Sequence, residues 1–457
     1  MCKIKIILIL SLLLFSSLLR GQSAFYGSWN GDIEAQGEKL TMAFHISKDG
    51  AMMDIPAQGL FNFPVELKCE NDYFVEIVVP QFGAAYKGTM TMGLIVGQFT
   101  QYGMSFPLTM KKGVIEYNRP QRPQPPFEYN IEEVSFRNSQ EGHILSGTLV
   151  SPKGADSSTP VVILVSGSGL QDRDETLMQH QPFWVIADYF AKNGIATLRY
   201  DDRGVGASTG DNSKATTESY KDDALAGIEY LRSLERFSKI GVLGHSEGGI
   251  IAYMLGAQGN VDFILSMAGP LLSGKEISLS QQRTLLSQPG ISPTIVNEFC
   301  SVAEKIYDYK KDSRSLDKAL EGTLVIESGE ALLKEIAPDL SAIPEPFYSS
   351  LLELASIAQP WMLYFLEYEP MDALRNVVCP SLLLFGGKDI QVPYKENIEK
   401  YGEEITAMSN ITLLLFEDCN HLFQEAVTGD ISEYVMIEQT ILPEVLEQMV
   451  NWINTNI

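Results

Sequence analysis

The sequence predicts an α/β fold: a doubly wound, mostly parallel sheet of about eight strands with a helical cap, preceded by a small all-β domain. Three observations support this. Short apolar runs alternate with amphipathic helical segments over residues 128–457, as strands buried on both faces of a parallel sheet do. The alternation stops once, at about 271–373, where the sequence is helical throughout. Residues 24–115 instead alternate polar and apolar side chains, as half-buried strands do.

Residues 1–23 have the composition of a secretory signal. Lys3 and Lys5 lie near the start, residues 6–19 are almost wholly apolar, and a short stretch of small and polar residues follows. The apolar run is short for a membrane span, so we expect a cleaved signal peptide and a periplasmic or extracellular protein. An uncleaved N-terminal anchor is the alternative. No later stretch is long and apolar enough to predict a membrane span.

The composition is that of a globular protein, with 45% hydrophobic and 20% charged residues over 457 positions, and this length favours two or three domains. The net charge of −24 becomes −27 without residues 1–22, which hold three basic residues and no acid. So acidic a chain repels nucleic acid and anionic membranes. No cofactor is expected, and the sequence gives no sign of an oligomeric state.

Four cysteines remain after the signal segment: Cys69, Cys300, Cys379 and Cys419. An even number in an exported chain permits two disulfides, but a chain of this length does not need them. Their spacing matches no metal site. We therefore expect free, mostly buried thiols rather than disulfides.

The all-β domain is expected to contain six to eight short strands. Alternating runs lie at 39–46, 73–79 and 97–101, and this spacing is typical of a small barrel or a sandwich. His45 lies within one of these strands, so a structural role is expected for it. A linker at 116–127 follows, in which four prolines among residues 119–126 favour an extended spacer.

The α/β domain is expected over residues 128–457. It opens with a hairpin, and six further apolar strands are predicted at 161–165, 195–200, 240–243, 263–267, 381–385 and 411–416. A helix at 219–234 carries Ala224, Ile228 and Leu231 on one stripe. Because the helical segment 271–373 follows the strand at 263–267, we expect it to form a cap at the carboxyl edge of the sheet.

The pattern G-x-S-x-G occurs twice, and context separates the two copies. Residues 244–248 follow the strand at 240–243 directly and lead into an apolar helix, the strand–turn–helix geometry that lifts a serine hydroxyl above a sheet. Residues 206–210 run into a loop instead. Ser246 is therefore the predicted nucleophile, and Ser208 a structural loop residue.

A serine nucleophile needs a base, and the base needs an orienting acid. Asp389 follows the strand at 381–385 and His421 follows the strand at 411–416, so both should reach the carboxyl edge of the sheet beside Ser246. Asp418, three residues before His421, is the alternative acid. Of the other histidines, His143 is expected in a hairpin turn and His180 in a surface helix. His245 lies next to the nucleophile, and its ring is expected to face away from it.

An oxyanion hole needs two N–H donors. One should be the backbone of Glu247, directly after the nucleophile. The other should come from the loop after the strand at 161–165, where two glycines allow close approach to a substrate oxygen. Ser168 and Gly169 are equal candidates. The charged residues at 172–174 are expected to form an ion-pair cluster that holds this loop.

Five motifs of the α/β domain occur in one order: S-G-S-G at 166–169 with Q-D-R-D at 171–174, Y-D-D-R-G-V-G at 200–206, G-H-S-E-G-G at 244–249, G-G-K-D at 386–389 and N-H-L-F at 420–423. Together they resemble secreted bacterial α/β hydrolases of the serine aminopeptidase-like group, usually described as esterases and often carrying an N-terminal β-domain. The resemblance covers residues 128–457 and implies the α/β-hydrolase fold with Ser246, Asp389 and His421 as the triad. Ser166 stands where many relatives have histidine, which leaves the detail of the oxyanion loop open.

The predicted function is hydrolysis of a carboxylic ester, carried by a small molecule or a glycan, through an acyl enzyme. The alternative among enzymes is an aminopeptidase or thioesterase, and the alternative outside them is a catalytically dead binding protein. The segment at 360–368 is unusually aromatic. It is expected either to contact substrate, through Trp361 and Tyr364, or to pack the cap onto the core.

Overall fold

The computed structural model describes residues 24–457 except 36–37, 59, 72, 288–289, 323–328 and 341–342. The signal peptide expected at 1–23 lies outside the described residues. The chain divides into two compact units. The first holds the described part of Met1–Asn118 together with Ile431–Met436, and the second holds Arg119–Asp430 and Ile437–Ile457.

The first unit contains a closed barrel of eight antiparallel strands. They are β1 (Gly27–Ala35), β2 (Glu38–Ser47), β3 (Gly50–Ile55), β4 (Leu60–Glu70), β5 (Phe74–Val79), β6 (Ala84–Thr91), β7 (Leu94–Gln101) and β8 (Met104–Lys112). Strands pair in chain order, and β8 closes the barrel on β1 with Trp29 opposite Lys112. Trp29, Phe44 and Tyr86 are among the side chains that fill the interior, so the alternation in the sequence separates the inner from the outer wall. Of the two expected architectures, the barrel is the one observed.

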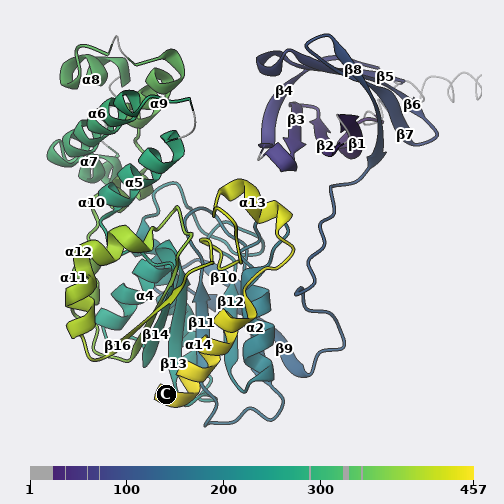
Figure 1. Cartoon of the computed structure of the whole chain (residues 1–457). Coiled ribbons are helices and arrows are strands. Elements are labelled where there is room, and N and C mark those ends of the chain that lie inside the picture. Colours follow the sequence, from purple (N-terminus) through teal and green to yellow (C-terminus); the bar gives the residue numbers. More distant parts are fainter. Residues whose placement is uncertain are drawn as a thin grey trace, which may run out of the picture. The chain divides into compact units, whose positions relative to one another are not determined.

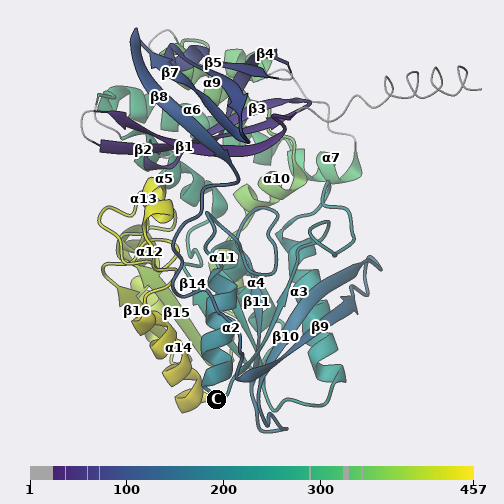
Figure 2. The same cartoon turned by 90° about the vertical axis from the view of Figure 1, so that its right-hand side faces the viewer.

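The second unit is built on an eight-stranded sheet in the order β16-β15-β14-β13-β11-β12-β10-β9 (Figure 1). The strands are β9 (Tyr129–Arg137), β10 (Ile144–Pro152), β11 (Val161–Val165), β12 (Ala196–Tyr200), β13 (Ile240–His245), β14 (Phe263–Met267), β15 (Ser381–Gly386) and β16 (Ile411–Phe416). Neighbours from β12 to β16 are parallel, whereas β10 is antiparallel to both β12 and β9. The β9–β10 hairpin and β16 lie at opposite edges of the sheet (Figure 2). The predicted fold class is confirmed.

Helices cover both faces of this sheet, which explains its continuously apolar strands. In β11, Val161, Ile163 and Val165 pack into one core, and Val162 and Leu164 pack into the other. The first core includes side chains of α3 (Thr217–Ser233), α4 (Glu247–Ala257) and α12 (Tyr394–Ala407), and the second includes side chains of α2 (Pro182–Lys192) and α14 (Pro443–Asn456).

Between β14 and β15 the chain forms a run of helices, which we call the cap. The cap comprises α5 (Gly274–Leu286), α6 (Pro293–Asp312), α7 (Ser315–Glu321), α8 (Gly329–Ile336), α9 (Glu345–Ala355) and α10 (Pro360–Glu367), and α11 (Pro370–Leu374) returns the chain to the sheet. The cap helices share a core of their own, in which Phe299, Ile306, Leu333 and Leu351 are buried. Figure 1 shows these helices gathered beyond one end of the sheet.

Candidate active site

Ser246 lies between β13 and α4, on a turn that only a few residues tolerate. Its backbone has φ 54° and ψ −117°, outside the φ/ψ regions that residues other than glycine usually adopt. A Cβ on Gly244 would lie 1.8 Å from the carbonyl oxygen of Gly248, and a Cβ on Gly248 would lie 2.1 Å from that of Val165. The glycines are therefore required by close backbone approach, and the turn presents the serine at the carboxyl edge of the sheet.

Asp389 and His421 meet at the same edge. Asp389 follows β15, His421 follows β16, and His421 Nδ1 lies 2.8 Å from Asp389 Oδ2. The backbone N–H groups of Gln391 and Val392 donate to Asp389 Oδ1 at 2.8 and 2.9 Å, so the carboxylate is held on both oxygens. With Nδ1–H donating to Asp389, the Nε2 atom of His421 is left to accept a proton.

The competing residues are occupied elsewhere. Asp418 forms an ion pair with Lys388 at 2.8 Å, and its side chain is 69% exposed. The hydroxyl of Ser208 donates to the carbonyl oxygen of Asp201 at 2.7 Å and accepts from the N–H of Ser146 at 2.9 Å. The structure thus brings Asp389, rather than Asp418, to His421.

The expectation of a surface position for His180 is wrong. Its ring is buried, with Nδ1 2.9 Å from Thr440 Oγ1 and Nε2 2.9 Å from Gln424 Nε2. The helix α2 begins only at Pro182, so His180 lies in the loop before it.

His45, on the barrel strand β2, lies 2.7 Å from Ser28 Oγ and 2.8 Å from Asp54 Oδ2.

The loop after β11 approaches the serine through Gly167 rather than Gly169. A Cβ on Gly167 would lie 3.1 Å from the Cβ of Ser246. Gly167 and Ser168 line the same cavity as Ser246, whereas Gly169 lines a void of about 10 Å³ behind the loop. Of the two oxyanion candidates from the sequence, Ser168 is the one beside the cavity. Glu247 is the first residue of α4, and it also lines the cavity.

Two aspartates after β12 hold this loop in place. Asp201 accepts hydrogen bonds from the backbone N–H of Arg173 at 2.9 Å and from its guanidinium at 2.8 and 3.0 Å. Asp202 accepts from the N–H of Gln171 at 2.9 Å and lies 3.2 Å from Ser166 Oγ. Burial raises the pKa of Asp202 to about 7, although these two contacts oppose the shift. The ion pairs of Arg173 and Asp174 thus run outside the loop, to Asp201, to Glu133 of β9 and to Arg199 of β12, and not to one another as the sequence suggested.

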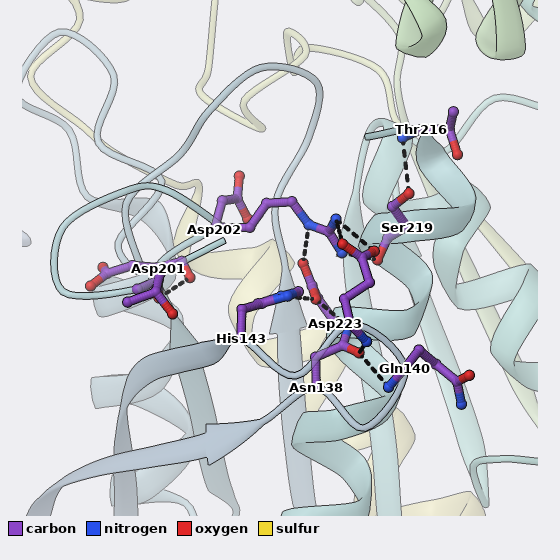
Figure 3. Close-up of polar contacts among 12 residues, drawn as sticks. Asn138, Gln140, His143, Asp201, Asp202, Thr216, Ser219 and Asp223 are labelled. Atoms are coloured by element: carbon purple, nitrogen blue, oxygen red, sulfur yellow. Dashed lines mark hydrogen bonds and ion pairs between the residues drawn. The ribbon is translucent and has the colours of Figure 1, made fainter. Parts of the chain in front are cut away.

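Arg203, the next residue of that turn, belongs to a separate network, of which Asn138, His143 and Asp223 are labelled in Figure 3. It donates to Asp223 Oδ2 at 2.7 Å and to Glu141 Oε1 at 2.9 Å. His143 Nε2 lies 2.7 Å from Asp223 Oδ1, and Asn138 Nδ2 donates to the same oxygen at 2.6 Å. The network joins the β9–β10 turn to α3, and none of these five residues is among the described residues that line the cavity around Ser246.

A cavity of about 340 Å³ surrounds Ser246 and His421. The cap contributes one of its walls, with Ile277, Ser278 and Gln281 from α5 and Trp361, Met362 and Phe365 from α10. A second hollow of about 300 Å³ is lined mainly by charged side chains of the cap and contains no predicted triad residue. The lining of the first cavity combines apolar side chains with about as many polar ones, so it offers a small molecule both apolar contacts and hydrogen-bonding groups.

Trp361 is held in this wall by Glu247, the residue after Ser246. Its Nε1–H donates to both carboxyl oxygens of Glu247, at 2.9 and 3.0 Å, and Thr217 Oγ donates to the same group at 2.7 Å. Burial raises the pKa of Glu247, although these hydrogen bonds oppose the shift. Tyr364 does not line the cavity, because its hydroxyl is directed at Glu218, 3.3 Å away. Of the two aromatic candidates, Trp361 is the one positioned to meet a substrate.

One residue of the site went unnoticed in the sequence. Glu175, in the loop between β11 and α2, is 5% exposed and contacts both His245 and Gly167. No motif or periodicity marks it. Its partner His245 contacts the backbone of His421, so its ring is part of the site's surroundings.

Three further properties concern the described residues alone. No group of three or more histidine, cysteine, aspartate or glutamate side chains among them could hold a metal ion. No helix in that part of the chain combines the length and apolarity needed to cross a membrane. Cys300, Cys379 and Cys419 are free thiols, as expected.

Comparison with known proteins points to hydrolases. The family described as serine aminopeptidase, S33, matches residues 180–313. The esterase EstD of Thermotoga maritima is 26% identical over 311 residues, which cover 67% of this chain and 65% of the relative. The chain thus spans slightly less than two thirds of that relative's length.

Two solved structures are similar at low identity. An esterase of Pyrococcus furiosus, Pf2001, is 16% identical, with 75% of this chain and 99% of that chain covered and a TM-score of 0.44. Est1E of Butyrivibrio proteoclasticus, solved with ferulic acid, is 16% identical, with 70% and 100% covered and a TM-score of 0.41. The resemblance noted in the sequence is confirmed: a serine aminopeptidase family model and an esterase match parts of the chain, and the N-terminal domain is all-β.

Proposed function

From an α/β-hydrolase domain that resembles esterases, we propose that this chain is a serine hydrolase that cleaves carboxylic esters through an acyl-enzyme intermediate. One observation carries the proposal: His421 Nδ1 lies 2.8 Å from Asp389 Oδ2, in a cavity that His421 lines together with Ser246 on its strained turn. A buried carboxylate, an imidazole and a serine that lines a cavity are the groups that nucleophilic acyl transfer needs.

In the proposed reaction, Ser246 Oγ attacks the ester carbonyl while His421 Nε2 takes the serine proton. Asp389 stabilises the imidazolium that forms. The backbone N–H groups of Glu247 and Ser168 face the developing oxyanion, and the N-terminus of α4 adds favourable partial charge. His421 then gives its proton to the departing alcohol oxygen, and a water molecule activated by the same ring releases the acid.

The lining of the cavity supports an uncharged substrate. No lysine or arginine occurs among its described lining residues. Its two glutamates already have protein partners: Glu175 lies 2.9 Å from His245 Nδ1, and Glu247 accepts from Thr217 and Trp361. The ammonium group of an aminopeptidase substrate would have to share these carboxyl groups with the partners that they already have. An ester is therefore favoured over a peptide with a free N-terminus.

Labelling with a fluorophosphonate probe tests the proposal, because the probe reacts only with an activated serine. The wild type should be labelled and should hydrolyse a short nitrophenyl ester. Ser246→Ala should lose both properties, and Ser208→Ala should keep both. An unlabelled, inactive wild type would instead favour the binding-protein alternative.

We also propose that the protein is exported, on the strength of the signal-like composition of residues 1–23. Fractionation of cells that express the full chain, followed by N-terminal sequencing, tests this. A shortened protein outside the cytoplasm is expected, whereas an intact chain in the cytoplasm would contradict it.

A further inference from the structure

Two buried ionisable groups lie beside the predicted triad without a part in the reaction above. His245 ends β13, directly before the nucleophile, and is 6% exposed. Glu175 is 5% exposed, and its backbone is left-handed, with φ 52°. A glutamate rarely adopts that conformation unless its surroundings fix it. Here the fixing contacts involve its carboxyl group.

These two side chains connect three segments of the site. His245 Nδ1 lies 2.9 Å from Glu175 Oε1, and His245 Nε2 lies 3.0 Å from the carbonyl oxygen of His421. The N–H of Gly167 donates to Glu175 Oε1 at 2.8 Å. The loop after β11, the end of β13 and the loop after β16 are thus joined by three hydrogen bonds beside Ser246.

The hydrogen-bond partners determine how many protons the Glu175–His245 pair carries. The carbonyl oxygen of His421 can only accept, so His245 Nε2 must carry a proton. The hydrogen bond between His245 Nδ1 and Glu175 Oε1 needs a second proton, bound either to the ring nitrogen or to the carboxyl oxygen. With both protons present, the pair is neutral overall and all three hydrogen bonds are made.

The electrostatics agree with that count. Burial opposes a charge on His245, but the Glu175 carboxylate and the contact to the His421 carbonyl outweigh it and raise the pKa of His245. The rings of His245 and His421 are 4.8 Å apart between centroids. An unpaired charge on His245 would oppose the imidazolium that must form on His421, and Glu175 cancels that charge.

We propose that Glu175 and His245 are a positioning pair, which holds the oxyanion loop and the backbone of His421 in register with Ser246. This inference rests on the proposed function. Neither side chain exchanges a proton with the substrate. The pair acts through Gly167 on one side and through the His421 carbonyl on the other.

The test compares Glu175→Gln, His245→Gln and the double variant with the wild type. Glutamine in place of Glu175 keeps the acceptor for Gly167 and the side-chain volume, so it guards against a loss of folding. His143→Gln is the matched control, since His143 is also a buried histidine beside a carboxylate, 2.7 Å from Asp223, but outside the cavity. The readouts are kcat and KM for a short nitrophenyl ester, the rate of fluorophosphonate labelling, and the melting temperature.

Each single variant should lower kcat and the labelling rate by roughly 10- to 100-fold, the effect of a small misplacement of reacting groups, with KM changed by less than about twofold. The double variant should be no slower than the worse single variant, because the two residues act as one unit. His143→Gln should lower the melting temperature but leave kcat unchanged.

If the wild type is labelled and active and both single variants have the wild-type kcat, the proposal of a positioning pair is overturned. The proposed function would still stand. Additive losses in the double variant would overturn it as well. A wild type that is neither labelled nor active would overturn the proposed function itself, and the pair with it.

Discussion

Asp202 offers the sharpest test of the electrostatics behind the oxyanion loop. The carboxyl group is almost fully buried, and burial, with the nearby Asp223 and Glu175 charges adding to it, raises its pKa to about 7. One carboxyl oxygen accepts from the N–H of Gln171 and the other from Ser166 Oγ. Both contacts favour the carboxylate, so the raised pKa reflects burial and the neighbouring charges.

The sign of the pH dependence follows from the direction of this shift. An unfolded aspartate loses its proton near pH 3.8, whereas the folded one keeps it to about pH 7. Between these values the folded state binds more protons, so its stability falls as the pH rises. Three pKa units correspond to about 4 kcal/mol of stability lost across the window.

Asp202→Asn removes that loss, because asparagine is a neutral group of the same shape. Its Oδ1 can accept from the N–H of Gln171, and its Nδ2 can donate to Ser166 Oγ. We compare the unfolding free energy of the variant with that of the wild type. The difference, in favour of the variant, should be about 2 to 3 kcal/mol larger at pH 8 than at pH 5. Urea unfolding of both proteins at the two pH values measures it. The control is Asp211→Asn, an exposed aspartate whose pKa is lowered by hydrogen bonds from Ser213; it should show no such gain. An equal gain at both pH values for Asp202→Asn would refute the reasoning.

Three further outcomes are expected. Asp389→Asn should lower kcat for a nitrophenyl ester by roughly 10³- to 10⁴-fold, since the imidazole loses its orienting acid, and Asp418→Asn should keep near-normal turnover. Trp361→Phe should change the acyl-length profile of kcat/KM, because the ring loses its anchor in the cavity wall, whereas Tyr364→Phe should leave the profile unaltered. Ser208→Ala should lower the free energy of unfolding by about 1 to 3 kcal/mol, from two lost buried hydrogen bonds, without loss of turnover.

The parts of the site that were predicted from the sequence depend on local geometry or on strand order. A strand, a glycine-flanked serine and an apolar helix occupy one continuous stretch, so the turn at Ser246 can be recognised from neighbouring residues alone. Asp389 and His421 are far apart in the chain, but each directly follows a strand. Because parallel strands end at one edge of a sheet, their meeting at 2.8 Å could be anticipated.

The parts that were missed depend on contacts that no local pattern records. Glu175 meets His245 across 70 positions of chain, and nothing near Glu175 in the sequence marks that contact. His180 looked like a surface residue because its helix was expected to begin earlier, whereas its ring is buried against Thr440. The choice between Ser168 and Gly169 likewise required the path of the loop, which is set by the two aspartates after β12.

The cap enters after β14 and leaves before β15, two adjacent strands of the sheet. Most of its buried side chains form a core separate from both cores of the sheet, and Ile277 and Phe365 join the cap to the first of these cores. Lineages that share the sheet could therefore gain, lose or exchange this insert without rebuilding the strands that carry the proposed acid, base and nucleophile. An incoming insert would have to replace the polar contacts of the present one, among them the indole N–H of Trp361 on the Glu247 carboxyl group, the Tyr364 hydroxyl on Glu218 and Gln281 Nε2 on the carbonyl oxygen of Gln391. Diversification of substrate range would then proceed by replacement of an insert, with the reaction chemistry inherited unchanged.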